Sequence, residues 1–203
     1  MNVVRYYLAL LLLSFTPPTF LFWLSIHPFV RFWRRLGLRL ALGINYAGLL
    51  VLAALIFVYC KPLLSVDFGT NPILIGLAVP LLVVSGAMRK RLSKHLRLAI
   101  LTGIPELAQE QHGTPLLTEG LYSRMRHPRY VQAILAVAAY TLICNYLATY
   151  VLFLATLVLI LLLVPMEERE LRQRFGVEYE TYCARVPRFI PRFRSPKLEP
   201  PQG

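Results

Sequence analysis

The sequence has 203 residues, of which 57% are apolar, with a formal net charge of +12 and a mean hydropathy of +0.56. This combination excludes a soluble nucleic-acid-binding protein, because the basic residues alternate with apolar runs of about 20 residues, the length that spans the hydrocarbon core of a bilayer. It indicates an integral membrane protein with a single domain over residues 1–203. The three cysteines have no metal-like spacing, so no metal site is expected.

The apolar runs predict an all-α integral membrane protein with about five transmembrane helices. The first run is too long for a signal peptide and lacks a small-x-small cleavage site, so we interpret it as a spanning helix. Pro17 and Pro18 lie in its middle, where the loss of backbone donors predicts a kink or a break. The expected spans are residues 6–26, 40–60, 72–88, 131–144 and 147–165.

The last two spans come from one apolar run over residues 131–165, which is broken only by Asn145 and a few hydroxyl groups. A single helix over this run would be roughly 50 Å long at about 1.5 Å per residue, well beyond a hydrocarbon core of about 30 Å. Two shorter helices therefore form a hairpin, with Asn145 and Tyr146 expected at its tip.

The distribution of basic residues predicts the orientation, because cytoplasmic loops of membrane proteins are enriched in Lys and Arg. If residues 31–39 are cytoplasmic, the N-terminus is outside, and residues 89–130 and the C-terminus are inside. Of the 22 Lys and Arg residues, only Arg5 and Lys61 then lie outside. Residues 98–118 are too polar to span and are expected to form an interfacial or cytosolic connection. We expect the membrane to be the inner membrane of a bacterium or an archaeon.

The chain after Pro165 is predicted to form a cytoplasmic helical cap over residues 166–194. A helix is expected to begin at Glu167, since acidic residues in a first turn complement the helix dipole. Gly176 is expected to interrupt this helix, and a second helical piece would end before Pro187. The Pro-rich residues 195–203 are expected to be a disordered tail.

Two polar clusters, residues 122–130 and 167–188, flank the hairpin and return to the same membrane face. Together they offer cationic donors, carboxylates and tyrosine rings, which are the groups that a zwitterionic aromatic ligand requires. S-adenosylmethionine has a carboxylate, an ammonium group and an adenine ring, together with a sulfonium that an aromatic ring or a carboxylate stabilises. The clusters are therefore a candidate site for this cofactor.

The motifs G-L-Y-x-x-x-R-H-P-x-Y at residues 120–130 and E-E-x-x-L-x-x-x-F-G-x-x-Y-x-x-Y-x-x-x-V-P-x-x-I-P at residues 167–191 carry a resemblance to a known family. In this order they resemble the paired signature of the isoprenylcysteine carboxyl methyltransferase family, and also the related membrane phospholipid methyltransferases. The first three spans match these enzymes only in hydropathy.

This resemblance implies a fold in which five membrane helices hold S-adenosylmethionine at the cytoplasmic side, beneath the C-terminal segment. Carried over by position, it implies Glu167 and Arg126 as catalytic residues. The implied cofactor-binding residues are Leu116, Leu117, Tyr122, His127, Pro128, Tyr130, Glu168, Tyr179 and Tyr182. In the isoprenylcysteine enzymes an arginine four residues before that glutamate helps to hold the substrate carboxylate, and the corresponding residue here is Leu163.

The predicted function is methyl transfer from S-adenosylmethionine to a lipophilic, membrane-embedded acceptor, such as the carboxylate of a prenylated cysteine. Glu167 would position the acceptor or take its proton. A methyltransferase for phospholipids or other lipophilic amines or thiols stays open, as does a non-catalytic membrane protein of the same fold. A transporter ranks last, because the expected spans carry no ionisable residue in mid-membrane. The expected partners are membrane lipids and a lipid substrate, not nucleic acid, and the oligomeric state is open.

Simpler interpretations exist for several of these residues. Arg124 and Arg129 fit interfacial anchors that follow the positive-inside rule. Glu168 fits a favourable first-turn acid. Tyr179 and Tyr182 share a helix face and also fit an interfacial aromatic belt.

Overall fold

The computed structural model describes residues 2–26, 28–95 and 115–191, and every regular element in these ranges is a helix. Four of the helices are long and apolar enough to cross a membrane. They are α1 (Asn2–Ile26), α3 (Leu38–Tyr59), α4 (Pro72–His95) and α8 (Leu147–Phe175). The protein is therefore an all-α, multi-pass membrane protein, as the hydropathy predicted.

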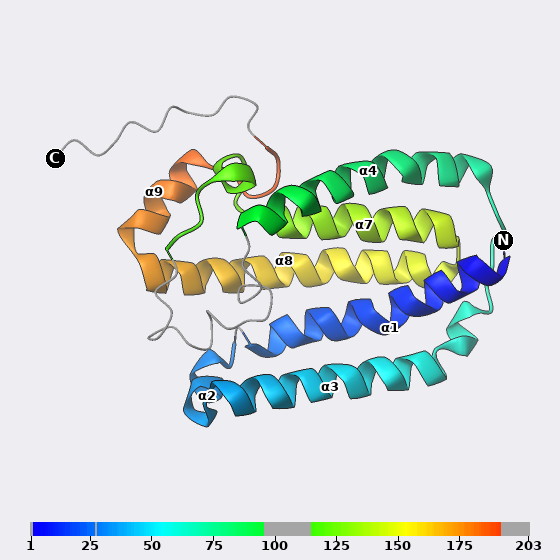
Figure 1. The fold of residues 1–203 in the computed structure, drawn as a ribbon, viewed down its shortest axis with the longest axis horizontal. Helices are drawn as coiled ribbons and strands as arrows, with labels where there is room; N and C mark the ends of the chain where they lie inside the picture. Colours follow the sequence, from blue (N-terminus) through cyan, green and yellow to red (C-terminus); the bar gives the residue numbers. More distant parts are fainter. Residues whose placement is uncertain (1, 27, 96–114, 192–203) are drawn as a thin grey trace.

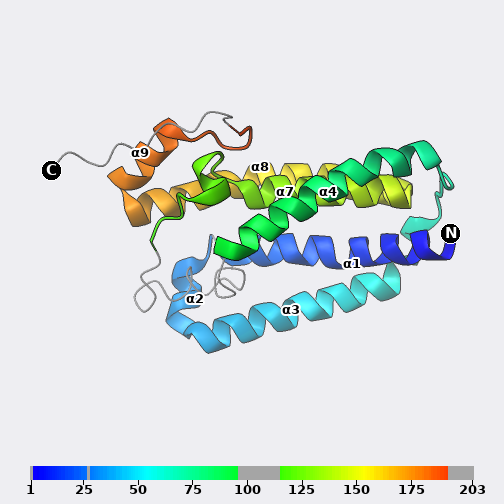
Figure 2. The same ribbon diagram turned by 45° about the horizontal axis from the view of Figure 1, so that its top comes forward.

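The fifth expected span corresponds to α7 (Pro128–Cys144), which is apolar but shorter, at 17 residues. It lies among the longer helices: α4 runs along α7, α8 runs beside it, and α1 packs against both α7 and α8 (Figures 1 and 2). Helix α3 lies at the edge of the bundle against α1, and only Ala41 and Ala53 of α3 are buried. The bundle thus has a core of α1, α7 and α8, with α3 and α4 on its flanks.

The hairpin between α7 and α8 turns at Asn145 and Tyr146, which confirms the predicted tip. Asn145 has the left-handed conformation, with a φ of 54°, and its N–H donates to the carbonyl of Thr141. Asn is one of the few residues that adopts this conformation at low cost. The Tyr150 hydroxyl donates to Asn145 Oδ1 at 2.9 Å, and this bond stabilises the turn.

Two proline-based expectations differ from the structure. Helix α1 continues through Pro17 and Pro18, so the expected break is absent from it. Helix α8 continues through Pro165 to Phe175, so no new helix begins at Glu167 and the acids there are not in a first turn. Proline costs a helix one backbone hydrogen bond and a steric clash, which packing of neighbouring membrane helices can offset.

Helix α8 is longer than a membrane requires. Its 29 residues extend over about 43 Å, against a hydrocarbon core of about 30 Å, so its last turns project beyond the core. At its end, Gly176 has a φ of 53° and breaks the helix as predicted, and α9 (Val177–Arg185) turns back across the end of the bundle (Figure 1). The short helix α2 (Val30–Leu36) joins α1 to α3 at this same end.

Two expectations fall outside the described residues. They are the expected tail over residues 195–203 and most of the expected connection over residues 98–118, of which only residues 115–118 are described.

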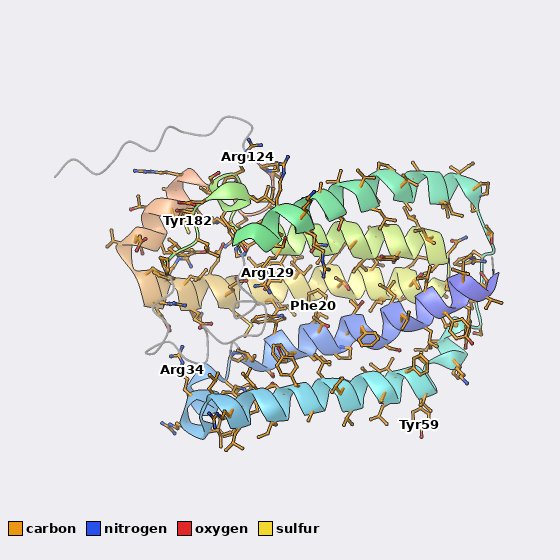
Figure 3. The ribbon with its side chains drawn as sticks, in the orientation of Figure 1. Phe20, Arg34, Tyr59, Arg124, Arg129 and Tyr182 are labelled. Atoms are coloured by element: carbon orange, nitrogen blue, oxygen red, sulfur yellow. The ribbon has the colours of Figure 1, made fainter. Side chains whose placement is uncertain are left out.

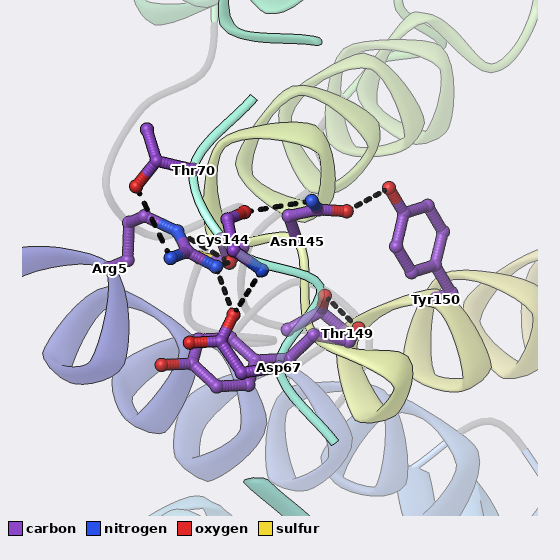
Figure 4. Close-up of polar contacts among 9 residues, drawn as sticks. Arg5, Asp67, Thr70, Cys144, Asn145, Thr149 and Tyr150 are labelled. Atoms are coloured by element: carbon purple, nitrogen blue, oxygen red, sulfur yellow. Dashed lines mark hydrogen bonds and ion pairs between the residues drawn. The ribbon is translucent and has the colours of Figure 1, made fainter. Parts of the chain in front are cut away.

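The opposite end of the bundle is fastened by a polar network, which we call the Arg5 cluster: Arg5, Asp67, Thr70, Cys144 and Asn145 (Figure 4). The buried Arg5 side chain pairs with Asp67 and donates to the Cys144 carbonyl from Nε at 3.0 Å and from Nη2 at 2.7 Å. Asn145 Nδ2 donates to the carbonyl of Gly69 at 2.9 Å. The cluster therefore joins α1, the loop before α4 and the hairpin tip.

Candidate functional site

The two polar clusters of the sequence meet at the end of the bundle that carries α9. The backbone N–H of Arg126 donates to the carbonyl of Pro187 at 2.8 Å, and that of His127 donates to the carbonyl of Arg188 at 3.0 Å. The segment after α9 is thereby paired with the segment before α7 (Figure 1). This confirms the expectation that the clusters flanking the hairpin are neighbours.

Glu168 lies at the centre of this site, and its side chain is fully buried. Arg188 donates two hydrogen bonds to it, from Nε to Oε1 at 3.0 Å and from Nη2 to Oε2 at 2.7 Å. His127 Nε2 lies 3.1 Å from Oε1, and Arg126 Nη2 lies 3.3 Å from the same oxygen. We call these four residues the Glu168 cluster. A buried carboxylate is stable only with such partners, and the two hydrogen bonds also raise the pKa of Arg188.

The bond to Glu168 determines which ring nitrogen of His127 carries the proton. A carboxylate only accepts hydrogen bonds, so Nε2 must be the donor. The other nitrogen, Nδ1, faces Glu167 Oε2 at 3.8 Å, which is too long for a hydrogen bond. Neighbouring glutamates thus have different surroundings: Glu168 is held on all sides, whereas Glu167 approaches His127 without bonding to it.

Several buried polar atoms in the site have no hydrogen-bond partner. Four such side-chain atoms occur among the residues that the structure describes. Three of them lie in the Glu168 cluster or next to it: Arg126 Nε, Glu167 Oε2 and the Tyr179 hydroxyl, which lies near the weakly accepting Cys183 thiol. Each such atom costs about 1–3 kcal/mol if nothing satisfies it. Their concentration in one place, with both donors and acceptors present, indicates a place where a polar ligand binds.

The tyrosines form the wall of the site. Tyr182 lies on α9 at this end of the bundle (Figure 3). Its hydroxyl donates to the Tyr122 carbonyl at 2.7 Å, which ties α9 to η2 (Gly120–Ser123), and its ring lies 6.0 Å from that of Tyr179. Burial raises the pKa of Tyr122 to about 12, and burial likewise raises the pKa values of Tyr179 and Tyr182, so all three phenols remain protonated at neutral pH. Because Tyr179 is buried, it belongs to the interior and not to an aromatic belt at the membrane surface.

On its other side the site adjoins the apolar core. The His127 ring lies 5.8 Å from the ring of Tyr130 and 5.9 Å from that of Phe189. Both aromatic residues pack against an apolar cluster that contains Leu163 and Trp23. A ligand in the site would therefore have polar groups on one side and the membrane-embedded core on the other.

The remaining predicted residues lie around this centre. Pro128 is buried as the first residue of α7. Leu116 packs against the tyrosines of α9, and Leu117 packs with Leu121 and Leu92 below η2. All of the predicted site residues therefore lie at one end of the bundle.

The sequence interpretation underestimated Glu168 and Arg188. Glu168 was equally explained as a first-turn acid, and Arg188 was one basic residue among several. The sequence carries no clear signal for Glu168, because α8 is apolar on every side before Pro165. In the structure its buried face repeats every four residues through Thr156, Ile160 and Val164, and the next position is Glu168. An acid that continues a buried helix face must have cationic partners.

Comparison with known proteins identifies the family of the chain. A family model described as "Ergosterol biosynthesis ERG4/ERG24 family" matches residues 91–193, which is half of the chain, and the protein belongs to this family. A probable protein-S-isoprenylcysteine O-methyltransferase of Oryza sativa subsp. indica is 38% identical over 84 residues, covering 41% of this chain and 43% of the relative. Protein-S-isoprenylcysteine O-methyltransferase B of Arabidopsis thaliana is 32% identical over 91 residues, covering 44% of this chain and 46% of the relative.

These matches bear out the resemblance that the two motifs carry. They span less than half the length of each of these relatives. No solved structure gives a significant match.

Proposed function

We propose that the protein transfers a methyl group from S-adenosylmethionine to a lipophilic acceptor that reaches the site from the membrane. The observation that carries this proposal is the group of unsatisfied polar atoms around the Glu168 cluster, at the end of an apolar helix bundle. The relatives named as O-methyltransferases support it.

The unsatisfied atoms suit the polar parts of this cofactor. Arg126 Nε is a donor for a carboxylate, and Glu167 Oε2 is an acceptor for an ammonium group or a close partner for a sulfonium. The partly exposed ring of Tyr130 offers a flat face for an adenine ring. S-adenosylmethionine supplies a methyl group bonded to a positively charged sulfur. An electron pair of the acceptor bonds to the methyl carbon, and the sulfur leaves with the electrons of the carbon–sulfur bond.

In this proposal the chain contributes alignment and proton handling. Methyl transfer is an in-line displacement, so holding the two reactants in one geometry accounts for much of the rate. A carboxylate acceptor is already ionised and needs no base. An amine or a thiol must lose a proton, and Glu167 Oε2, which has no hydrogen bond of its own, is the group placed to accept it. Glu168 is unsuited to this role, because its oxygens are occupied by His127 and Arg188.

The first candidate for the acceptor is the carboxylate of a prenylated cysteine, following the names of the plant relatives. The position where the resemblance implies a carboxylate-holding arginine is Leu163, which is fully buried in the apolar core. A methyltransferase for phospholipids or other lipophilic amines is therefore the second candidate. A non-catalytic protein of the same fold would keep the bundle without binding the cofactor.

The proposed orientation places the site and the C-terminus in the cytoplasm, with residues 166–194 as the capping segment and the N-terminus outside. The basic residues of α2 and of the last turns of α4 lie at the site's end of the bundle, as the positive-inside rule requires for a cytoplasmic face (Figure 1). The expectation of a bacterial or archaeal inner membrane stays a prediction, since the relatives compared here are plant proteins, which fit a eukaryotic membrane.

A transfer assay with S-adenosylmethionine carrying a radiolabelled methyl group tests the function. Purified protein is incubated in parallel with membrane lipid extracts and with prenylcysteine analogues. Label is expected in one acceptor class, and base-labile label in the prenylcysteine fraction indicates a carboxyl methyl ester. Absence of transfer to any lipophilic fraction by folded, cofactor-binding protein would contradict the proposal.

A further inference from the structure

Arg129 is a basic residue that the Glu168 cluster does not use. It lies in the first turn of α7, and its guanidinium carbon is 5.0 Å from the centre of the Trp23 ring on α1. Trp23 is itself buried and belongs to the apolar cluster that contains Leu163. Figure 3 shows Arg129 in the half of the bundle nearer to α9, in the region of Phe20. The charge is therefore held at the boundary between the polar site and the apolar core.

This placement differs from that of a simple membrane anchor. Arg124, five residues earlier, has an exposed side chain, as expected for an anchor that reaches towards headgroups and water. Arg129 is only partly exposed and is folded onto a buried indole. Within the described part of the chain, no carboxylate lies within ion-pair distance of Arg129.

The geometry of the stacking contact leaves hydrogen-bonding capacity unused. A guanidinium over an aromatic ring uses its flat face, whereas its five N–H donors lie in its plane. Those donors form a planar fork that matches the two oxygens of a carboxylate or a phosphate. The contact with Trp23 restrains the guanidinium, and within the described part of the chain its N–H donors make no hydrogen bond.

Arg129 is also electrostatically close to the proposed methyl-transfer site. Burial is the largest cause of the raised pKa of Tyr122, while the Arg129 charge opposes that rise and the Glu167 charge adds to it. Both charges therefore lie near the same phenol. Arg129, as the cation for the acceptor, and Glu167, as the carboxylate that faces the cofactor, would therefore both lie near Tyr122.

We propose that Arg129 binds the anionic group of the lipid acceptor and so selects acceptors that carry a single anion next to their hydrocarbon chain. This inference rests on the proposed function for the meaning of the site, but the binding of the anion is a property of its own. Two sources share the chemistry: the carboxylate of a prenylated cysteine and the phosphodiester of a phospholipid.

The test is direct binding without turnover, with wild-type protein, Arg129→Gln and the control Arg124→Gln in lipid nanodiscs. In the first arm the probes are S-farnesylated N-acetylcysteine and its neutral carboxamide. In the second arm they are phosphatidylethanolamine and the uncharged diacylglycerol. Wild type is expected to prefer the probe that carries the carboxylate or the phosphodiester in one arm, and that arm identifies the source.

Loss of a hydrogen-bonded charge pair is expected to reduce this preference about 10- to 100-fold in Arg129→Gln, with Arg124→Gln unchanged. If Arg129→Gln does not fold, Arg129→Lys replaces it, because lysine keeps the charge near Trp23 but lacks the planar fork. A several-fold loss of preference is then expected.

Equal binding of anionic and neutral probes by wild type in both arms would overturn the inference, as would the same preference in the Arg129 and Arg124 variants. Titration with S-adenosylmethionine is run separately on the same samples. Absence of cofactor binding would reject the proposed function, whereas the probe comparison still decides the role of Arg129.

Discussion

The two ends of the bundle both bury an arginine beside a carboxylate, but they differ in how completely the polar atoms are satisfied. At the Arg5 cluster, the guanidinium bonds to the Cys144 carbonyl, pairs with Asp67, donates to Thr70 at 3.4 Å and lies over the ring of Tyr146 at 5.2 Å (Figure 4). At the Glu168 end, three buried polar atoms have no partner within the described part of the chain.

This difference distinguishes a structural polar network, the Arg5 cluster, from a candidate binding site at the Glu168 end. The Arg5 cluster is reinforced by backbone bonds from Phe68 N–H to the Asn145 carbonyl and from Leu147 N–H to the Val66 carbonyl, both at 3.1 Å. Such a closed network stabilises the fold and offers nothing to a ligand. The Glu168 cluster stabilises the cap over the site and, around its edge, presents donors and acceptors that a ligand would complete.

The variant Glu168→Gln should have the largest effect. It removes the charge that Arg126 and Arg188 face. Leaving the largely buried Arg126 without its partner costs up to about 3–5 kcal/mol, whereas Arg188 is about half exposed and loses less. Since the segment after α9 is held through Arg188, the site should lose its cap and its affinity for S-adenosylmethionine should fall about 100-fold or more. Calorimetric titration measures this. An affinity equal to that of wild type would mean that Glu168 does not organise the site.

Arg5→Met should affect stability instead of binding. It leaves the buried Cys144 carbonyl without its donors, at a cost of about 1–3 kcal/mol, and it leaves the partly exposed Asp67 without its cation. Thermal unfolding should show a lower midpoint. Methyl transfer per folded molecule, measured well below that midpoint, should stay within twofold of wild type. A loss of transfer without a loss of stability would contradict the division between the two ends.

Glu167→Gln should separate chemistry from folding within the Glu168 end. Glutamine keeps the shape of the side chain and Glu167 Oε2 has no hydrogen bond to lose, so the free energy of unfolding should change by no more than about 1 kcal/mol. Turnover should fall about 10- to 100-fold through loss of proton acceptance or positioning, with cofactor affinity changed much less. Steady-state kinetics and titration on the same preparation check this. Unchanged turnover with intact cofactor binding would remove Glu167 from the mechanism.

Asn145→Ala should have the smallest effect, confined to the Arg5 end. Alanine in the left-handed conformation costs about 1–2 kcal/mol, and the bond to the Gly69 carbonyl is also lost. The matched variant Asn145→Gly loses the same bond but tolerates the conformation. Thermal unfolding should therefore rank Ala below Gly, with transfer unchanged in both. Equal midpoints would show that the backbone conformation at the tip is not strained.

Much of the fold was predictable, because membrane crossings leave a strong signal in hydropathy and the tip of the hairpin carries Asn145, which the turn requires. The continuity of α8 through Pro165 was not predictable from local propensity, since the packing of neighbouring helices compensates for the lost hydrogen bond. The pairing of Arg5 with Asp67 was also not predictable from the sequence, because it depends on how segments far apart in the chain pack together.

The site was predictable as a neighbourhood but not in its detail. The two motifs predicted residues that the structure brings to one end of the bundle, whereas Arg188 and Phe189 were not among the predicted site residues. The different roles of Glu167 and Glu168 depend on a rotation of about 100° between successive residues of a helix, and so on the rotation of α8 relative to its neighbours. The contact between Arg129 and Trp23 joins α7 to α1, so the position of Arg129 in the motif indicated only a basic residue near the membrane surface.

The most direct test of the account is calorimetric titration of S-adenosylmethionine into folded wild-type protein, Arg5→Met and Glu168→Gln at a temperature below all three unfolding midpoints. Saturable binding of one cofactor per chain is expected in wild type and in Arg5→Met, and its loss is expected in Glu168→Gln. Absence of saturable binding in wild type, or equal binding in the two variants, would contradict the claim that the Glu168 end is the cofactor site.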